Sequence, residues 1–82
     1  MAAAGLQGAP AHTARGRRLA ALILDRSSRT GLRLGARLPT ERQLSIEFGV
    51  TRSSVRHALA ILEAEGRISR EVGRGTFLRA AP

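Results

Sequence analysis

The chain has 82 residues, a length that suits one small domain with a modest core. It contains no cysteine, which excludes a disulfide scaffold and a thiolate zinc site. Its formal net charge is +8, carried entirely by arginine, and a small domain this basic usually binds nucleic acid, a membrane surface or an acidic protein. A GC-rich genome would also enrich arginine, but it would not determine where the arginines lie.

The N-terminal part of the chain is expected to hold a tail and then a helix. Residues 1–15 are rich in alanine, glycine and proline without a steady period, so we expect a flexible tail there. Leu19, Leu22 and Ile23 then fall at i, i+3 and i+4. This spacing predicts an amphipathic helix over about 17–28.

A second, shorter helix is predicted to begin after Thr40. Thr40 and Gln43 match a capping box, in which each side chain binds the backbone N–H of the other residue. Gly49 suits the left-handed position that ends a helix. Arg42 would lie in the first turn, at the positive end of the helix dipole, where a cation is unfavourable unless an anion such as phosphate is near.

The third helix is predicted over about 52–65, with Thr51 as its N-cap and Gly66 after its end. It has a regular apolar stripe at i, i+3, i+4 and i+7, made of Val55, Ala58, Leu59 and Leu62. Two helices joined by so short a turn, the second of them strongly amphipathic, form a helix-turn-helix pattern.

Two β-prone runs, 68–72 and 76–79, surround Gly73-Arg74-Gly75 and predict a hairpin. The expected fold is mainly α with a small β-hairpin: a winged helix-turn-helix of three helices and a two- or three-stranded wing. We place this domain at residues 16–79, and residues 80–82 form a C-terminal tail or the start of a linker.

The polar face of the third helix is the strongest functional signal. Small or cationic side chains crowd its N-terminal end, namely Thr51, Arg52, Ser53, Ser54, Arg56 and His57. A recognition helix presents such residues to base edges in the major groove, where arginine can pair with guanine and hydroxyl groups can hold phosphate. The first acid in this helix is Glu63.

Arg52 and Arg56 lie at i and i+4, a like-charge spacing that mildly destabilises a free helix. Without acids nearby, this pair of cations indicates an anionic partner. The alternative is an ordinary surface helix with a serine-rich start, in which Thr51 would be needed as a cap in any case.

The wing adds a second basic element, because Arg70, Arg74 and Arg79 lie on the hairpin. A tip made of Gly73, Arg74 and Gly75 allows close backbone approach. Such a tip can enter the minor groove beside the recognition helix. The alternative is a solvated hairpin whose charged edges prevent aggregation.

We expect no enzymatic activity, no cofactor and no metal site. The six acids form no close pair suited to catalysis, and no nucleophile triad or phosphate-binding loop is present. His57 has no second ligand at zinc spacing. We expect it to be a surface or interface residue.

Several separate motifs, in order, resemble the N-terminal domain of the GntR family of bacterial regulators. They are Leu38-Pro39-Thr40-Glu41-Arg42-Gln43-Leu44, Gly49-Val50-Thr51-Arg52-Ser53-Ser54-Val55-Arg56, Ala58-Leu59 with Leu62-Glu63-Ala64-Glu65-Gly66, and Gly73-Arg74-Gly75-Thr76-Phe77. The resemblance implies a helix-two phosphate and base contact at Arg42, recognition-helix contacts at Thr51, Arg52, Ser53, Ser54 and Arg56, and a wing tip around Gly73. Where family members often have threonine, Ser53 and Ser54 keep the hydroxyl.

The resemblance also implies dimers on palindromic operators. We therefore expect a sequence-specific double-stranded DNA binder that acts as a repressor in the bacterial cytoplasm, on the nucleoid, with a possible homodimer and no membrane partner. A small-molecule effector is expected only if a C-terminal domain exists outside this chain. Two other functions stay open: a non-specific nucleic-acid-binding protein, and a winged helix that binds an acidic protein.

Overall fold

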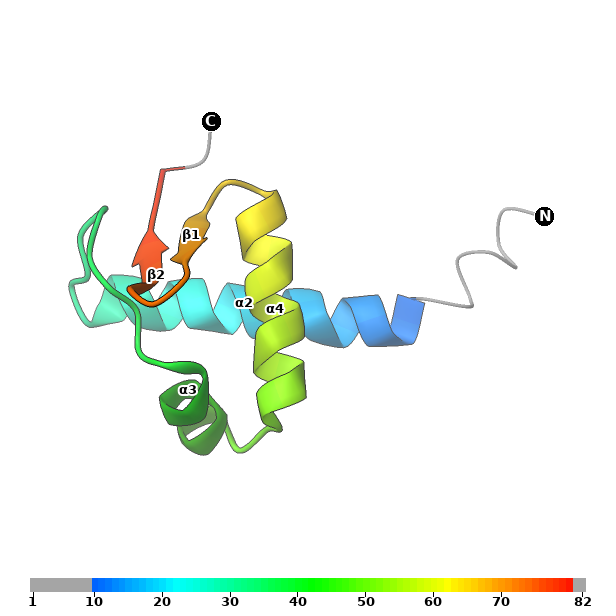
Figure 1. The fold of residues 1–82 in the computed structure, drawn as a ribbon. Coiled ribbons are helices and arrows are strands. Elements are labelled where there is room, and N and C mark those ends of the chain that lie inside the picture. Colours follow the sequence, from blue (N-terminus) through cyan, green and yellow to red (C-terminus); the bar gives the residue numbers. More distant parts are fainter. Residues whose placement is uncertain (1–9, 81–82) are drawn as a thin grey trace.

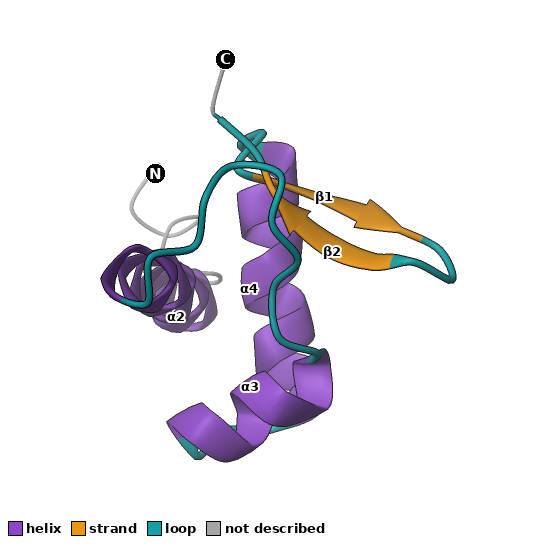
Figure 2. Cartoon of the chain, turned by 90° about the vertical axis from the view of Figure 1, so that its left-hand side faces the viewer, coloured by secondary structure: helices purple, strands orange, loops and turns teal. Residues whose placement is uncertain are grey.

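The structure is a computed structural model that describes residues 10–80. Three helices, α2 (Pro10–Arg29), α3 (Glu41–Phe48) and α4 (Arg52–Ala64), precede an antiparallel sheet of β1 (Ile68–Glu71) and β2 (Gly75–Leu78). α4 crosses α2, and α3 lies at the N-terminal end of α4 (Figure 1). The hairpin projects away from the helices (Figure 2). This confirms the predicted winged helix-turn-helix.

α2 is longer than the sequence pattern predicted. It begins at Pro10 instead of near residue 17, so residues 10–15, which we expected in the tail, are helical. The apolar period begins only at Leu19, and it therefore gave no sign of the earlier turns. Proline is nonetheless well suited to the first turn of a helix, where its missing N–H needs no partner. Residues 1–9 of the expected tail lie outside the described residues.

Gly16 allows α2 to approach α4 closely. A Cβ atom at this position would lie 2.4 Å from Cδ2 of His57 and 2.9 Å from Cδ1 of Ile61, closer than carbon atoms can pack. His57 therefore lies against α2, at the interface of α2 with α4. An interface is one of the two places expected for this residue.

The α3–α4 turn has the predicted caps. The Thr40 hydroxyl accepts from the Gln43 N–H at 3.1 Å, and the Gln43 side chain accepts from the Thr40 N–H at 2.8 Å. Gly49 ends α3 with φ 66° and ψ 36° in the left-handed region. The Thr51 hydroxyl accepts from the Ser54 N–H at 3.0 Å and caps α4.

The hairpin loop lies one residue earlier in the chain than predicted. Glu71 pairs with Gly75, so Gly75 belongs to β2 and the connection consists of residues 72–74. Arg37 forms an isolated bridge with Phe77, and the Leu38 N–H donates to the Thr76 carbonyl at 2.8 Å. The wing therefore has two strands with a short third segment beside β2.

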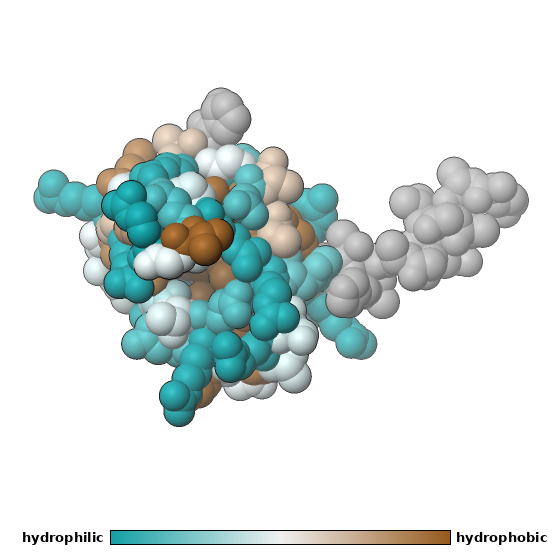
Figure 3. All heavy atoms as spheres, viewed as in Figure 1, coloured by the Kyte–Doolittle hydropathy of each residue, from teal (hydrophilic) through white to brown (hydrophobic). Residues whose placement is uncertain are grey.

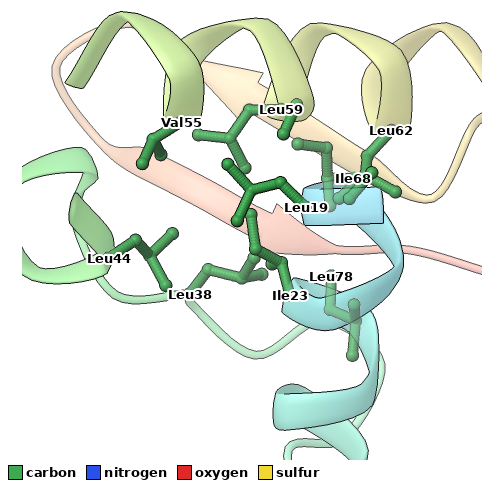
Figure 4. Packing of buried hydrophobic residues seen from close by; sticks show 11 residues of the cluster. Leu19, Ile23, Leu38, Leu44, Val55, Leu59, Leu62, Ile68 and Leu78 are labelled. Atoms are coloured by element: carbon green, nitrogen blue, oxygen red, sulfur yellow. The ribbon is translucent and has the colours of Figure 1, made fainter. Parts of the chain in front are cut away.

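The core lies where α2, α4 and the hairpin meet, and α3 closes it from one end (Figure 4). All four members of the predicted α4 stripe are buried. Leu22 is an exception to the expected α2 stripe, because it is 42% exposed. The cluster consists of Leu19, Ala20, Ile23, Leu38, Leu44, Val55, Ala58, Leu59, Leu62, Ile68 and Leu78.

Over the described residues, 10–80, no helix combines the length and the apolar character that crossing a membrane requires.

Candidate nucleic-acid interface

The first turn of α4 directs its polar side chains to solvent while Val55 is fully buried beneath them. Helical geometry produces this division, since the cap and the buried stripe fix the rotation of α4 about its axis. The predicted contacts on this face are all exposed: Thr51, Arg52, Ser53, Ser54 and Arg56.

Two of the hydroxyl groups on this face already have partners. The Thr51 hydroxyl donates to the Ser54 hydroxyl at 3.0 Å and also accepts from the Ser54 N–H. Both side chains thus help to hold the start of α4. Within the described residues, Ser53 makes no such contact with its hydroxyl, and it is the serine best placed to bind a partner.

Arg42 and Arg52 stand at the starts of α3 and α4 with exposed side chains. Neither forms an ion pair with any carboxylate of residues 10–80. A guanidinium group in this state keeps its full set of donors for a phosphate or a guanine edge. These two residues meet the expectation of arginines available to an anionic partner.

Arg56 does not meet that expectation in full. Its Nη2 lies 3.5 Å from Oε1 of Glu41, at the start of α3, and Oε2 of the same carboxylate lies 3.3 Å from Nη2 of Arg70 on β1. The expectation that no acid lies near this arginine was therefore wrong. The Arg56 side chain is 53% exposed, so the pair orients it more than it stabilises the fold.

The wing repeats this arrangement. Oε1 of Glu71 lies 3.1 Å from Nη1 of Arg74, and its Oε2 lies 3.1 Å from Nη2 of Arg79. The two guanidinium groups lie 5.8 and 5.7 Å from the centre of the Phe77 ring. Arg74 is exposed at the predicted wing tip, but it is held back by contacts within the hairpin.

Gly73 and Gly75 serve the wing in different ways. Gly73 has φ 77°, which suits glycine, and nothing would meet a Cβ there within 4 Å. Gly75, by contrast, would place a Cβ 2.6 Å from Nε of Arg37. The Arg37 side chain therefore lies beside the first residue of β2, next to the wing tip, in the place that a larger residue at 75 would occupy.

Arg37 and Val72 are two residues of this face that the motif analysis did not select. Arg37 is exposed, without an ion pair among the described residues, and lines a hollow of about 380 Å³ with Arg70 and Arg74. The sequence signal that could have identified Arg37 is its position just before the Leu38-Pro39-Thr40 run. Val72, which we assigned to a strand, lies at the tip with full exposure.

The front of the molecule is mainly hydrophilic around the hairpin and α4 (Figure 3). The shared carboxylate of Glu41 connects the polar side of α4 to β1. The structure thus brings the start of α3, the start of α4 and the wing together into one basic face.

Comparisons with known proteins agree with this geometry. Residues 15–78 match the family model described as bacterial regulatory proteins, gntR family. The chain is 45% identical over 62 residues to the Putative L-lactate dehydrogenase operon regulatory protein of Escherichia coli (strain K12), with 76% of this chain and 22% of that protein covered. It is 49% identical over 41 residues to the HTH-type transcriptional repressor NagR of Bacillus subtilis (strain 168), covering 50% and 17%. The chain spans about a fifth of the length of these relatives.

Solved structures show the same fold. The possible transcriptional regulator YydK from Bacillus subtilis superposes with a TM-score of 0.75 at 28% identity, covering 83% of this chain and 30% of that one. AraR(DBD), solved in complex with operator ORX1, superposes with a TM-score of 0.70 at 26% identity, covering 78% and 77%. With its motifs, its fold and its matched residues in agreement, the chain belongs to the gntR family of bacterial regulatory proteins.

Proposed function

We propose that this chain binds double-stranded DNA at specific sequences, as the operator-reading domain of a bacterial transcription regulator. The observation that carries the proposal is the pair of arginines without an ion-pair partner among residues 10–80, Arg42 and Arg52, at the starts of the two helices of the helix-turn-helix. Two arginines without carboxylate partners contribute little to the stability of a surface that faces only water. Phosphates and guanine edges, by contrast, bind such guanidinium groups.

The arrangement supports a separate role for each element. α4 enters the major groove, where Arg52 reads a base edge and Ser53 contacts a base or a phosphate. Arg42 anchors a phosphate, and the N-terminal amides of α3 favour the same anion. Arg56 is presented by Glu41, and the wing around Gly73 follows the adjacent minor groove. Thr51 and Ser54 hold the start of α4 in position for these contacts.

The relatives support regulation by operator binding. AraR(DBD) forms a complex with operator ORX1, and NagR is named a repressor. For this chain we propose repression in the bacterial cytoplasm, on the nucleoid, by two copies on a palindromic site and without catalysis. An effector ligand would act through a further domain, since the relatives are several times longer than the matched part.

The test is selection of bound duplexes from a randomised library at physiological salt. The unchanged chain should enrich a short motif. Arg52→Ala should lose about 1–3 kcal/mol of binding free energy on that motif and lose its base preference at one position. Arg67→Ala is the matched control, because Arg67 is exposed and follows the opposite end of α4. This substitution removes the same charge and should leave the selected motif unchanged.

The remaining outcomes favour the two other functions. DNA retained with no motif would identify a non-specific binder held by net charge. Equal losses of affinity from Arg52→Ala and Arg67→Ala would indicate the same. No retention of DNA would favour the winged helix that binds an acidic protein.

A further inference from the structure

Val72 is an unusual residue for the tip of a basic hairpin. It is 102% exposed, so it packs against nothing in the domain. Turn positions favour glycine, asparagine, aspartate and serine, while a branched apolar side chain contributes nothing to a turn. Single exposed apolar residues are common on protein surfaces. Val72 is informative because it lies on the same face as the residues proposed to contact DNA.

The contacts within the wing leave Val72 exposed at the tip of the hairpin. Glu71 holds the guanidinium groups of Arg74 and Arg79 at 3.1 Å, beside the Phe77 ring. The next residue, Gly73, has no side chain that could cover the tip. The hairpin projects away from the helices (Figure 2). The wing tip therefore presents an apolar group and a glycine beside the guanidinium group of Arg74, whose side chain is tethered to Glu71 but still 73% exposed.

We propose that Val72 is a specificity-determining residue that enters the minor groove beside the recognition site and selects A·T base pairs there. This inference rests on the proposed function, and it adds to it a chain-specific means of reading the flanking sequence. The ligand class is B-form DNA with at least one A·T pair under the wing.

The chemistry of the minor groove supports this selection. An A·T pair offers acceptors alone in that groove, whereas a G·C pair adds the guanine 2-amino donor. The valine side chain has no acceptor for that donor, so contact with G·C would bury an unpaired N–H group. The exocyclic amine also projects from the groove floor into the space that the branched side chain needs. Both effects favour A·T, and neither needs a hydrogen bond from the protein.

The experiment measures Kd for duplexes that share the selected core motif and differ at the base pair under the wing, located by scanning the flank. The flank carries A·T, G·C or inosine·C, which keeps the major-groove edge of G·C but lacks the 2-amino group. The unchanged chain should bind A·T and inosine·C flanks alike, and G·C at least about fivefold more weakly.

Val72→Thr is the informative variant, since threonine keeps the branched shape and adds a hydroxyl acceptor. Its hydroxyl oxygen can accept from the guanine 2-amino group, while its branched shape keeps the steric effect, so the discrimination against G·C should decrease but not vanish and the core motif should be retained. Leu34→Thr is the control. Leu34 is 65% exposed in the loop before α3, outside the hairpin, so this variant should discriminate as the unchanged chain does. Circular dichroism checks that both variants fold.

The outcomes separate the inference from the function on which it rests. If the unchanged chain enriches a core motif but binds G·C and inosine·C flanks equally, the role of Val72 is overturned and operator reading stands. Unaltered discrimination in Val72→Thr would likewise overturn it. If no core motif is enriched, the proposed function fails and the inference fails with it.

Discussion

At the scale of single residues, the basic face contains two kinds of arginine. Arg42 and Arg52 have no carboxylate partner among the described residues, whereas Arg56 and Arg74 are each held by an acid that also binds a second arginine. A free guanidinium group binds phosphate without first breaking an ion pair. A held one loses less side-chain entropy when it binds in the orientation that its acid imposes.

Arg42→Ala should weaken binding to all DNA sequences by a similar factor. Arg42 lies in the first turn of α3, where a phosphate contact carries no sequence information. The slope of log K against log salt concentration should decrease in magnitude by about one unit. Fluorescence anisotropy titrations at several salt concentrations measure this slope. A loss confined to the selected motif, with the salt slope unchanged, would instead assign Arg42 to base reading.

Glu41→Gln should raise affinity for random DNA and lower the ratio of specific to random binding. The carboxylate lies 3.5 Å from Arg56 and 3.3 Å from Arg70. Its loss removes a negative charge from the DNA-facing side and also releases Arg56 from its fixed orientation. The free energy of unfolding should fall by less than about 1 kcal/mol, because the paired side chains are partly exposed.

Glu63→Gln is the control for that change. Glu63 is exposed near the far end of α4 and forms no ion pair with the described residues. It alters net charge equally, so it should leave the specificity ratio as in the unchanged chain. Two variants with indistinguishable ratios would show that Glu41 acts through net charge alone.

At the scale of elements, the angle between α3 and α4 depends on the backbone at Gly49. This residue has φ 66°, and a Cβ atom added to it would meet no other atom within 4 Å. Gly49→Ala should therefore destabilise the domain by about 1–2 kcal/mol through backbone strain and not through a clash. Gly49→Asn should cost less, because asparagine tolerates the left-handed region. Urea denaturation of both variants measures the difference, and equal losses would contradict this explanation.

The elements that local chemistry controls could be predicted closely from the sequence. The capping box of Thr40 and Gln43, the left-handed Gly49 and the Thr51 cap each involve residues within one turn of one another. The hairpin register could not be fixed in this way. It depends on the alignment of β2 with Arg37 and Leu38, which contact it across the fold. The extra turns of α2 lie outside any apolar period and were missed for that reason.

In the candidate site, too, local features could be predicted from the sequence and long-range contacts could not. The exposure of Arg52 and Ser53 follows from the buried stripe of α4, and the sequence pattern contains that information. The Glu41–Arg70 contact joins residues 29 positions apart, so no local pattern reveals it. The exposed Val72 was likewise hidden, because a β-prone residue beside a strand is most simply assigned to that strand.

At the scale of the whole molecule, the ion pairs within the fold use only part of the positive charge of the arginines. Within residues 10–80, seven ion pairs engage seven of the 14 basic residues, and five of the six acids take part. The other arginines form no ion pair in this part of the chain: Arg15, Arg18, Arg33, Arg37, Arg42, Arg52 and Arg67. Such an excess draws the domain to any DNA, so specificity must come from the few residues that read base edges.

One domain reads a short half-site, so a palindrome should be recognised by two copies on the same face of the duplex. Half-sites one helical turn apart, about 34–36 Å between centres, bring the two copies side by side. Inserting about five base pairs turns one half-site to the opposite face. If the copies contact each other, the second should bind more tightly at the original spacing than after the insertion. Electrophoretic mobility shifts on both duplexes resolve the one-copy and two-copy complexes. Identical stepwise affinities at both spacings would show that these domains bind independently and that one copy does not help the other to bind.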